Sequence, residues 1–262
     1  MRYGDLTYKE IQERAGGSLA IVPTGCTEQQ GPHLPVDFDT YFVEQVCLAA
    51  SEKAASDFEV QSLVLPAIPF GPTPEHRNYG SGYVDIPVKL HNDLVFATLD
   101  SLAEQGFQRI VVWRGCGGHD LRDAVSRFND KYAGKSKAFL PGHPYHDIWC
   151  RIADPSVPGG HADSFGTSIA MHLRPESVRV DKIVDPDHGE VNWQDPNMDF
   201  KTYSRTGVIG DPTHASAALG AKLWEAVVDE TAAILRSIAK DERTGNAVDP
   251  DRLHFLRRST DR

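Results

Sequence analysis

Short apolar segments alternate along this sequence with longer segments of helical periodicity, and this alternation constrains the fold more than any other feature. Each apolar run is brief enough to form one buried strand. Strands that alternate with helices predict an α/β domain with a mostly parallel sheet, in a three-layer α/β/α sandwich. The predicted strands are 18–23, 60–68, 109–113 and 137–140. The predicted helices begin near residue 39, span 90–105, begin near residue 120, and span 161–173 and 214–238.

The loops that follow the strands are the expected place for a functional site, because ligands of parallel sheets bind outside the carboxyl ends of the strands. The loop after the first strand is polar and rich in glycine and proline, and the loop after the third contains Gly-Cys-Gly-Gly at 115–118. His143, His146 and Asp147 follow the fourth strand. They are interpreted as a pocket wall, as replacement ligands or as a solvated loop.

Composition narrows the class of protein. The 262 residues include 27 lysines and arginines against 37 aspartates and glutamates, a net charge of −10. This balance disfavours a nucleic-acid partner, since such proteins need a basic face. No apolar run approaches the roughly 18 residues of a membrane helix, and the first residues lack the apolar core of a signal peptide. We expect a cytoplasmic protein without a membrane partner, with one domain over 1–240 and a charged C-terminal extension over 241–262.

Acidic and imidazole side chains are concentrated in the loop after the first strand. Glu28, His33, Asp37 and Asp39 lie in one short stretch. Carboxylates and imidazoles that converge after a strand can bind a divalent metal or transfer protons. The alternative is a solvated polar loop, because most acidic loop residues face water.

Five motifs in order resemble the creatininase (creatinine amidohydrolase) family. Residues 25–39, GCTEQQGPHLPVDFD, resemble its first motif, Gly-Ser-x-Glu-Gln-His-Gly-Pro-His-Leu-Pro with a later Asp. Residues 65–76 (LPAIPFGPTPEH), 114–119 (RGCGGH), 161–168 (HADSFGTS) and 210–212 (GDP) resemble the family's later motifs in the same order. Motifs in series are far more specific than any one alone. The resemblance extends over about residues 3–238.

The resemblance implies a fold, a chemistry and an assembly. Family members hold two metal ions, zinc or manganese, which activate water against a C–N bond, often in a cyclic amide, and they form homohexamers. By position, Glu28 matches a metal-binding glutamate and Asp39 matches the aspartate that bridges both metals. His161 matches the histidine that assists catalysis and proton transfer.

Four further residues are expected to contact a small-molecule substrate. Glu75 and His76 lie in the segment that resembles the family's substrate-facing loop. His33 matches the second histidine of the first motif, and His119 closes the loop after the third strand. No sequence feature identifies the substrate.

Several family ligand positions are changed in this chain. Gln30 replaces a metal-binding histidine, Cys116 replaces the loop histidine, and Gly118 and Gly166 stand where members have a glutamate. Cys26 replaces a serine of the first motif. A site with two metals would therefore lack ligands.

We expect either one divalent metal per chain, zinc or manganese, or none. Glu28, Asp39 and Cys116 would hold it, because thiolates and carboxylates are both zinc ligands. One of His119, His161 and Asp163 would complete the ligand set.

Cys116 has three interpretations. It is a metal ligand, a nucleophile or an inert filler. As a nucleophile it would be activated by nearby cations and use His119 or His161 as its base, without metal.

Three functional hypotheses follow. The first is a divergent creatininase-like amidohydrolase that cleaves a C–N bond in a small polar substrate, cyclic amides included, in a specialised biosynthetic or catabolic step. Its catalytic residues would be His161, Cys116 and Glu28. The second is a metal-free enzyme that uses Cys116 or the carboxylates for acyl transfer, amide formation or ring opening. The third is a non-catalytic binding or assembly protein on the same fold.

Overall fold

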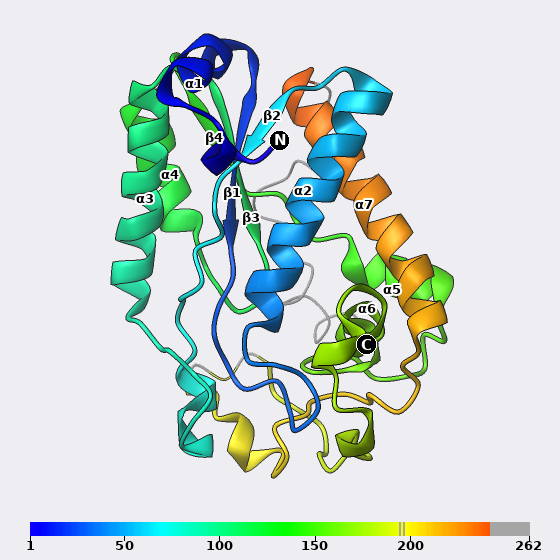
Figure 1. The fold of residues 1–262 in the computed structure, drawn as a ribbon. Helices are drawn as coiled ribbons and strands as arrows, with labels where there is room; N and C mark the ends of the chain where they lie inside the picture. Colours follow the sequence, from blue (N-terminus) through cyan, green and yellow to red (C-terminus); the bar gives the residue numbers. More distant parts are fainter. Residues whose placement is uncertain (194, 196, 242–262) are drawn as a thin grey trace.

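A parallel sheet with helices on both faces forms the centre of the molecule (Figure 1). The computed structural model describes residues 1–193, 195 and 197–241. The strands are β1 (Leu19–Thr24), β2 (Ser62–Val64), β3 (Arg109–Arg114) and β4 (Lys137–Phe139), and all neighbours are parallel in the order β2-β1-β3-β4. The predicted parallel sheet between helical layers is confirmed.

The helices form the two outer layers. Those beside one face are α3 (Val88–Glu104) and α4 (Arg122–Lys131), and those beside the other are α2 (Phe38–Phe58) and α7 (Ala217–Ala239) (Figure 1). Near the lower end of α7 lie α5 (Tyr145–Ile152) and α6 (Ser164–Leu173), and α1 (Tyr8–Arg14) lies at the opposite end of the sheet. A short 3-10 helix, Pro74–Tyr79, belongs to the loops below the sheet.

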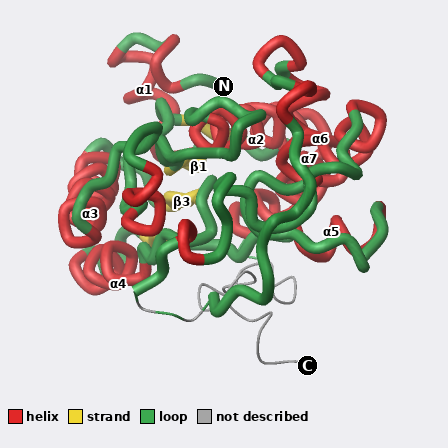
Figure 2. The backbone as a smooth tube through the Cα atoms, turned by 90° about the horizontal axis from the view of Figure 1, so that it is seen from below, coloured by secondary structure: helices red, strands yellow, loops and turns green. Residues whose placement is uncertain are grey.

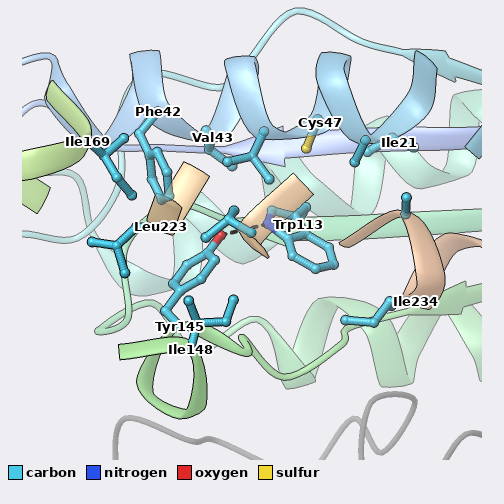
Figure 3. Close-up of a cluster of buried hydrophobic side chains, with 14 of the residues drawn as sticks. Ile21, Phe42, Val43, Cys47, Trp113, Tyr145, Ile148, Ile169, Leu223 and Ile234 are labelled. Carbon is cyan, nitrogen blue, oxygen red and sulfur yellow. Dashed lines mark hydrogen bonds between the residues drawn. The ribbon is translucent and has the colours of Figure 1, made fainter. Parts of the chain in front are cut away.

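Each sheet face has its own core because successive strand residues point to opposite sides. In β1, Leu19 and Ile21 join the core beneath α2 and α7, whereas Ala20 and Val22 join the core beneath α3 and α4. Figure 3 shows the first of these cores, where the Nε1–H of Trp113 donates to the hydroxyl of Tyr145 over 3.0 Å. Trp113 lies in β3 immediately before Arg114, the last residue of the strand that precedes the candidate site.

The strand order places a ligand crevice between β1 and β3. From β1 the chain continues to β2, which lies along one edge of β1. It then crosses to β3, which lies along the opposite edge of β1. At such a reversal the two following loops diverge and leave a crevice at the carboxyl ends of the strands. Figure 2 views the molecule from this end, where loops cover the strands.

The observed helices differ from the predicted ones at two places. The helix predicted over 161–173 begins only at Ser164, because the backbone of His161 pairs with Ile209 in an antiparallel bridge. Asp163 caps α6 by accepting from the amides of Phe165 and Gly166. The second difference is α5, a helix that the sequence pattern does not predict.

The predicted extension over 241–262 lies outside the described residues except for Asp241. None of the helices in the described part of the chain combines the length and apolar character that a membrane crossing needs.

Candidate active site

Four buried acidic side chains meet in the crevice between β1 and β3. They are Cys26 and Glu28 from the loop after β1, Asp39 from the first turn of α2 and Cys116 from the loop after β3. Their thiol and carboxylate atoms all lie within 4.8 Å of one another. The structure thus brings together the three predicted metal ligands and adds Cys26, which the sequence analysis did not assign to the site.

Strand register and two glycines explain why these residues meet. Thr24 pairs with Arg114 across β1 and β3, so Cys26 and Cys116 each lie two residues beyond a matched pair. A side chain on Gly25 would place its Cβ 2.4 Å from Cα of Thr40, and one on Gly115 would place it 2.6 Å from the carbonyl oxygen of Asp39. Glycine at both positions lets the two loops pack against the start of α2.

Hydrogen bonds tie the cluster together. The thiol of Cys26 donates to Oδ2 of Asp39 over 3.0 Å. Gln30 donates from Nε2 to the same Oδ2 over 3.0 Å and to Oε1 of Glu28 over 3.4 Å. Gln30, which stands at a family ligand position, therefore presents its N–H group to the carboxylates and acts as a donor that holds them together.

The electrostatics of the cluster favour a cation. Burial, together with the negative charge at Cys116, raises the pKa of Glu28 well above its usual range. Burial and the Glu28 carboxylate do the same to the pKa of Asp39. Without a cation, these groups must retain protons because like charges this close disfavour each other. A bound divalent cation would replace those protons, since metal ligands bind in their deprotonated forms.

Cys116 and His119 form an oppositely charged pair beside the carboxylates. Ligand atoms of His119, Cys26 and Cys116 lie within 4.8 Å of one another. The thiol of Cys26 and the imidazolium of His119 lower the pKa of Cys116 well below its usual range. Burial acts to lower the pKa of His119, but the negative Cys116 and its carboxylate neighbours outweigh burial and raise it to about 9.

A second group, Glu28 with two histidines, adjoins the cluster on its other side. Nε2 of His76 lies 3.3 Å from Oε2 of Glu28, and Nδ1 of His161 lies 3.4 Å from Oε1. Burial lowers the pKa of both histidines, that of His161 to about 3. The two rings are therefore neutral near pH 7, and each presents one donor and one acceptor.

Hydrogen bonds with Gln29 determine which ring nitrogens of His76 and His161 carry the protons. Its Oε1 accepts from the amide of Gly31, and its Nε2 donates to the carbonyl of Gly207 and to Nδ1 of His76. His76 must then carry its proton on Nε2, the nitrogen that faces Glu28. The backbone carbonyl of Gln29 accepts from Nε2 of His161 over 2.6 Å, so Nδ1 of His161 is the acceptor that faces Glu28.

This proton arrangement argues against His76 as a metal ligand. A metal-bound histidine donates its second ring N–H to an acceptor. At His76 the second nitrogen instead faces the donor Nε2 of Gln29. The Glu28–His76–His161 group is therefore poorly suited to hold a metal, although its atoms lie within 4.8 Å of one another.

The cluster opens into a cavity of about 320 Å³. Glu28, Asp39, Cys116 and His161 lie at its polar part, together with Glu75. The remaining wall is largely aromatic, a feature that the sequence analysis missed because its members come from distant segments. The aromatic lining residues are Phe38, Phe42, Tyr145, Trp149, Phe165, Trp193 and Phe200.

The predicted substrate contacts divide into two groups. Glu75 and His76 line the cavity. His33 and His119 are not among its lining residues: both are almost fully buried, and Nε2 of His33 lies 2.8 Å from the hydroxyl of Thr167. His143 and His146 belong to the cavity wall, as one of the interpretations expected.

Asp163 is a further candidate metal ligand, but its carboxylate accepts hydrogen bonds from backbone amides. Besides capping α6, it accepts from the amide of Gly160 over 2.7 Å. It belongs to none of the groups of ligand atoms found among the described residues.

Comparison with known proteins supports the resemblance seen in the sequence. The family described as Creatininase: Creatinine amidohydrolase matches residues 4–235. This chain belongs to the creatininase family. As a member of it, with relatives named as amidohydrolases and peptidases, the chain is a hydrolase of C–N bonds.

The curated relatives of this creatininase-family chain have different printed activities. It is 31% identical over 223 residues to the mycofactocin precursor peptide peptidase of Mycobacterium tuberculosis, covering 80% of this chain and 81% of the relative. It is 26% identical over 208 residues to the creatinine amidohydrolase of Pseudomonas putida, covering 70% and 75%.

Solved structures of creatininases share the fold of this family member. A mutant creatininase described as "Zn-Zn type" has a TM-score of 0.78 at 23% identity and covers 90% of this chain and 96% of that one. A structure described as "Creatininase Mn" also has a TM-score of 0.78, at 22% identity, and covers 90% and 97%.

Proposed function

We propose that this chain is a metal-dependent amidohydrolase whose metal is held by Glu28, Asp39 and Cys116. The observation that carries this proposal is the buried cluster of acidic ligand atoms, which lie within 4.8 Å of one another beside the cavity. Several buried acidic groups this close are costly unless a cation offsets their charge. The donor set of carboxylate and thiolate matches zinc better than manganese, which prefers oxygen ligands.

A divalent metal in this cluster would supply Lewis acidity, which polarises a carbonyl and lowers the pKa of water. The chain's own residues would manage the protons and hold the ligands. Nδ1 of His161 is an unprotonated acceptor at the cavity, 3.4 Å from Glu28. It is placed to take a proton and to return it to the leaving nitrogen. Gln30 donates a hydrogen bond to the Glu28 carboxylate, and Nε2 of His76 lies 3.3 Å from its other oxygen.

The substrate that we propose is a small molecule with a polar C–N group, a cyclic amide or a short peptide amide. The cavity of about 320 Å³ is at the lower end of ordinary small-molecule pockets, which begin at roughly 300 Å³. Its aromatic wall would accept an apolar portion next to the scissile amide. Relatives named as a peptide peptidase and as a creatinine amidohydrolase support both kinds of amide. A role in a specialised biosynthetic or catabolic step is part of the proposal.

We also propose a cytoplasmic homo-oligomer, with a homohexamer as the expected form. Its support in this chain is a set of exposed apolar side chains on α3, namely Val88, Leu90 and Leu94.

The test is metal content together with turnover. Wild-type protein, Cys116→Ala and Cys150→Ala would be purified, and zinc, manganese and iron would be measured by elemental mass spectrometry. Cys150 is exposed on α5 and serves as the matched control. We expect about one zinc per chain in the wild type and the control, a large loss in Cys116→Ala, and chelator-sensitive release of amine from a panel of cyclic and peptide amides. Wild-type protein without metal would refute the proposal.

A second candidate is favoured by the Cys116–His119 pair. A thiolate next to an imidazolium is the arrangement of a cysteine nucleophile. In that enzyme Cys116 would attack the carbonyl without metal. Turnover that resists chelators and is lost in Cys116→Ala would support this candidate against the first.

A further inference from the structure

We infer that Cys26 is a second thiolate ligand, so that the metal centre contains two sulfur and two carboxylate donors. The inference rests on the proposed metal site and specifies its composition. Cys26 stands where the family motif has a serine, a residue whose hydroxyl is a far weaker metal ligand than a thiolate. None of the expectations drawn from the sequence included Cys26 in the ligand set.

Geometry places the Cys26 sulfur among the other ligand atoms. Its Sγ lies 3.0 Å from Oδ2 of Asp39 and within 4.8 Å of Oε of Glu28 and Sγ of Cys116. With zinc–sulfur and zinc–oxygen bonds of about 2.3 and 2.1 Å, ligand atoms of a tetrahedral site lie about 3.4 to 3.8 Å apart. Small side-chain movements therefore suffice to bring the four donors to one ion.

The register of β1 and β3 explains why the two sulfur atoms lie close together. Thr24 and Arg114 are paired at the ends of β1 and β3, and Cys26 and Cys116 each follow by two residues in the loops that leave these strands. Equal offsets from a paired position bring the two cysteines to the same end of the sheet. Both side chains are buried, so neither sulfur needs to move in from solvent.

The Cys26 sulfur also approaches from the side opposite the substrate. Glu28, Asp39 and Cys116 line the cavity, whereas Cys26 does not and has no exposed surface. A ligand on the side of the metal away from the cavity would hold the ion and leave its cavity-facing coordination position open. Two thiolates also shift the preference of the site from manganese toward zinc, because soft ligands select zinc.

The first measurement needs only the wild-type chain. Zinc-loaded protein would be studied by X-ray absorption at the zinc edge, which counts sulfur neighbours. We expect two sulfur scatterers per zinc at about 2.3 Å. A single sulfur scatterer would overturn the role of Cys26 while leaving the proposed hydrolase site intact, and a chain that takes up no zinc would overturn both.

The second measurement uses variants loaded with cobalt, whose charge-transfer absorption reports bound thiolates. Cys26→Ser and Cys116→Ser should each lose about half of the band per bound cobalt, and the double variant should lose nearly all of it, while Cys150→Ser should match the wild type. An unchanged band in Cys26→Ser would refute the inference. Cys26→Ala serves as a second variant if Cys26→Ser fails to fold.

Discussion

Gln29 donates a hydrogen bond from its side-chain Nε2 to Nδ1 of His76 over 3.0 Å. Because Oε1 of Gln29 already accepts from the amide of Gly31, the amide cannot turn around to accept from His76. The proton of His76 is therefore placed on Nε2, toward Glu28. Through its backbone carbonyl the same residue sets the tautomer of His161. One glutamine thus directs the protons of both histidines that adjoin the Glu28 carboxylate.

We expect Gln29→Glu to disturb catalysis through these histidines. A carboxylate there would accept a hydrogen bond from Nδ1 of His76 and raise the pKa of that ring. It would also repel the carbonyl of Gly207, which now accepts a hydrogen bond from Nε2 of Gln29. Partners of this kind cost about 10- to 100-fold in activity or metal affinity when changed. Turnover and histidine nitrogen chemical shifts would be measured against Gln61→Glu, an exposed control. Unchanged nitrogen shifts for His76 would contradict the tautomer assignment.

A second prediction concerns the packing of His119. A Cβ on Gly71 would lie 2.1 Å from Cε1 of His119, so the ring needs glycine at that position. We expect Gly71→Ala to lower the free energy of unfolding by about 1 to 3 kcal/mol, the usual cost of overpacking. It should also raise the pKa of Cys116 by moving its imidazolium partner away.

Chemical denaturation and thiol-reactivity titration would measure these two effects. Gly16→Ala is the control, since no atom lies within 4 Å of the Cβ that it would add. A Gly71→Ala protein with the stability and thiol titration of the wild type would show that His119 does not depend on Gly71.

The sequence predicted the fold and placed several residues of the candidate site together because both depend on local patterns. Runs of apolar residues marked the four strands, and one continuous motif carried Glu28 and Asp39. Cys26 and Gln29 were missed for a common reason: their roles depend on partners across the fold. The role of Cys26 depends on Cys116 in the loop after a neighbouring strand, and that of Gln29 depends on His76 and His161.

Two local errors have similar causes. His161 lies before its helix and not within it, since its backbone pairs with Ile209, far along the chain. The aromatic cavity wall includes Phe38, Trp193 and Phe200, which no sequence spacing connects.

A third prediction is a pH dependence of stability that originates at His33. Burial lowers the pKa of His33 to about 4, below the value of about 6.5 in an unfolded chain. Below pH 6.5 the unfolded chain takes up a proton that the folded His33 does not, so stability falls as the pH decreases from 6.5 toward 4. At pH 5 the loss from this residue amounts to about 2 kcal/mol relative to pH 7.

The measurement compares unfolding free energies at pH 7 and pH 5 for the wild type and His33→Gln. The variant removes this titration but leaves the other buried histidines in place, so its loss between the two pH values should be smaller by about 2 kcal/mol. Equal losses in the two proteins would show that His33 does not titrate between the folded and unfolded states as expected.

The last prediction separates proton transfer from metal binding at His161. A glutamine at this position can keep the donation that Nε2 of His161 makes to the carbonyl of Gln29, but it lacks the acceptor nitrogen that faces Glu28. We therefore expect His161→Gln to lower kcat by about 100- to 10,000-fold, the usual contribution of a general acid–base group, with unchanged metal content. His214→Gln is the matched control, since His214 is exposed. Loss of metal in His161→Gln would instead place the ion between Glu28 and the two histidines, and full activity would exclude His161 from the proton path.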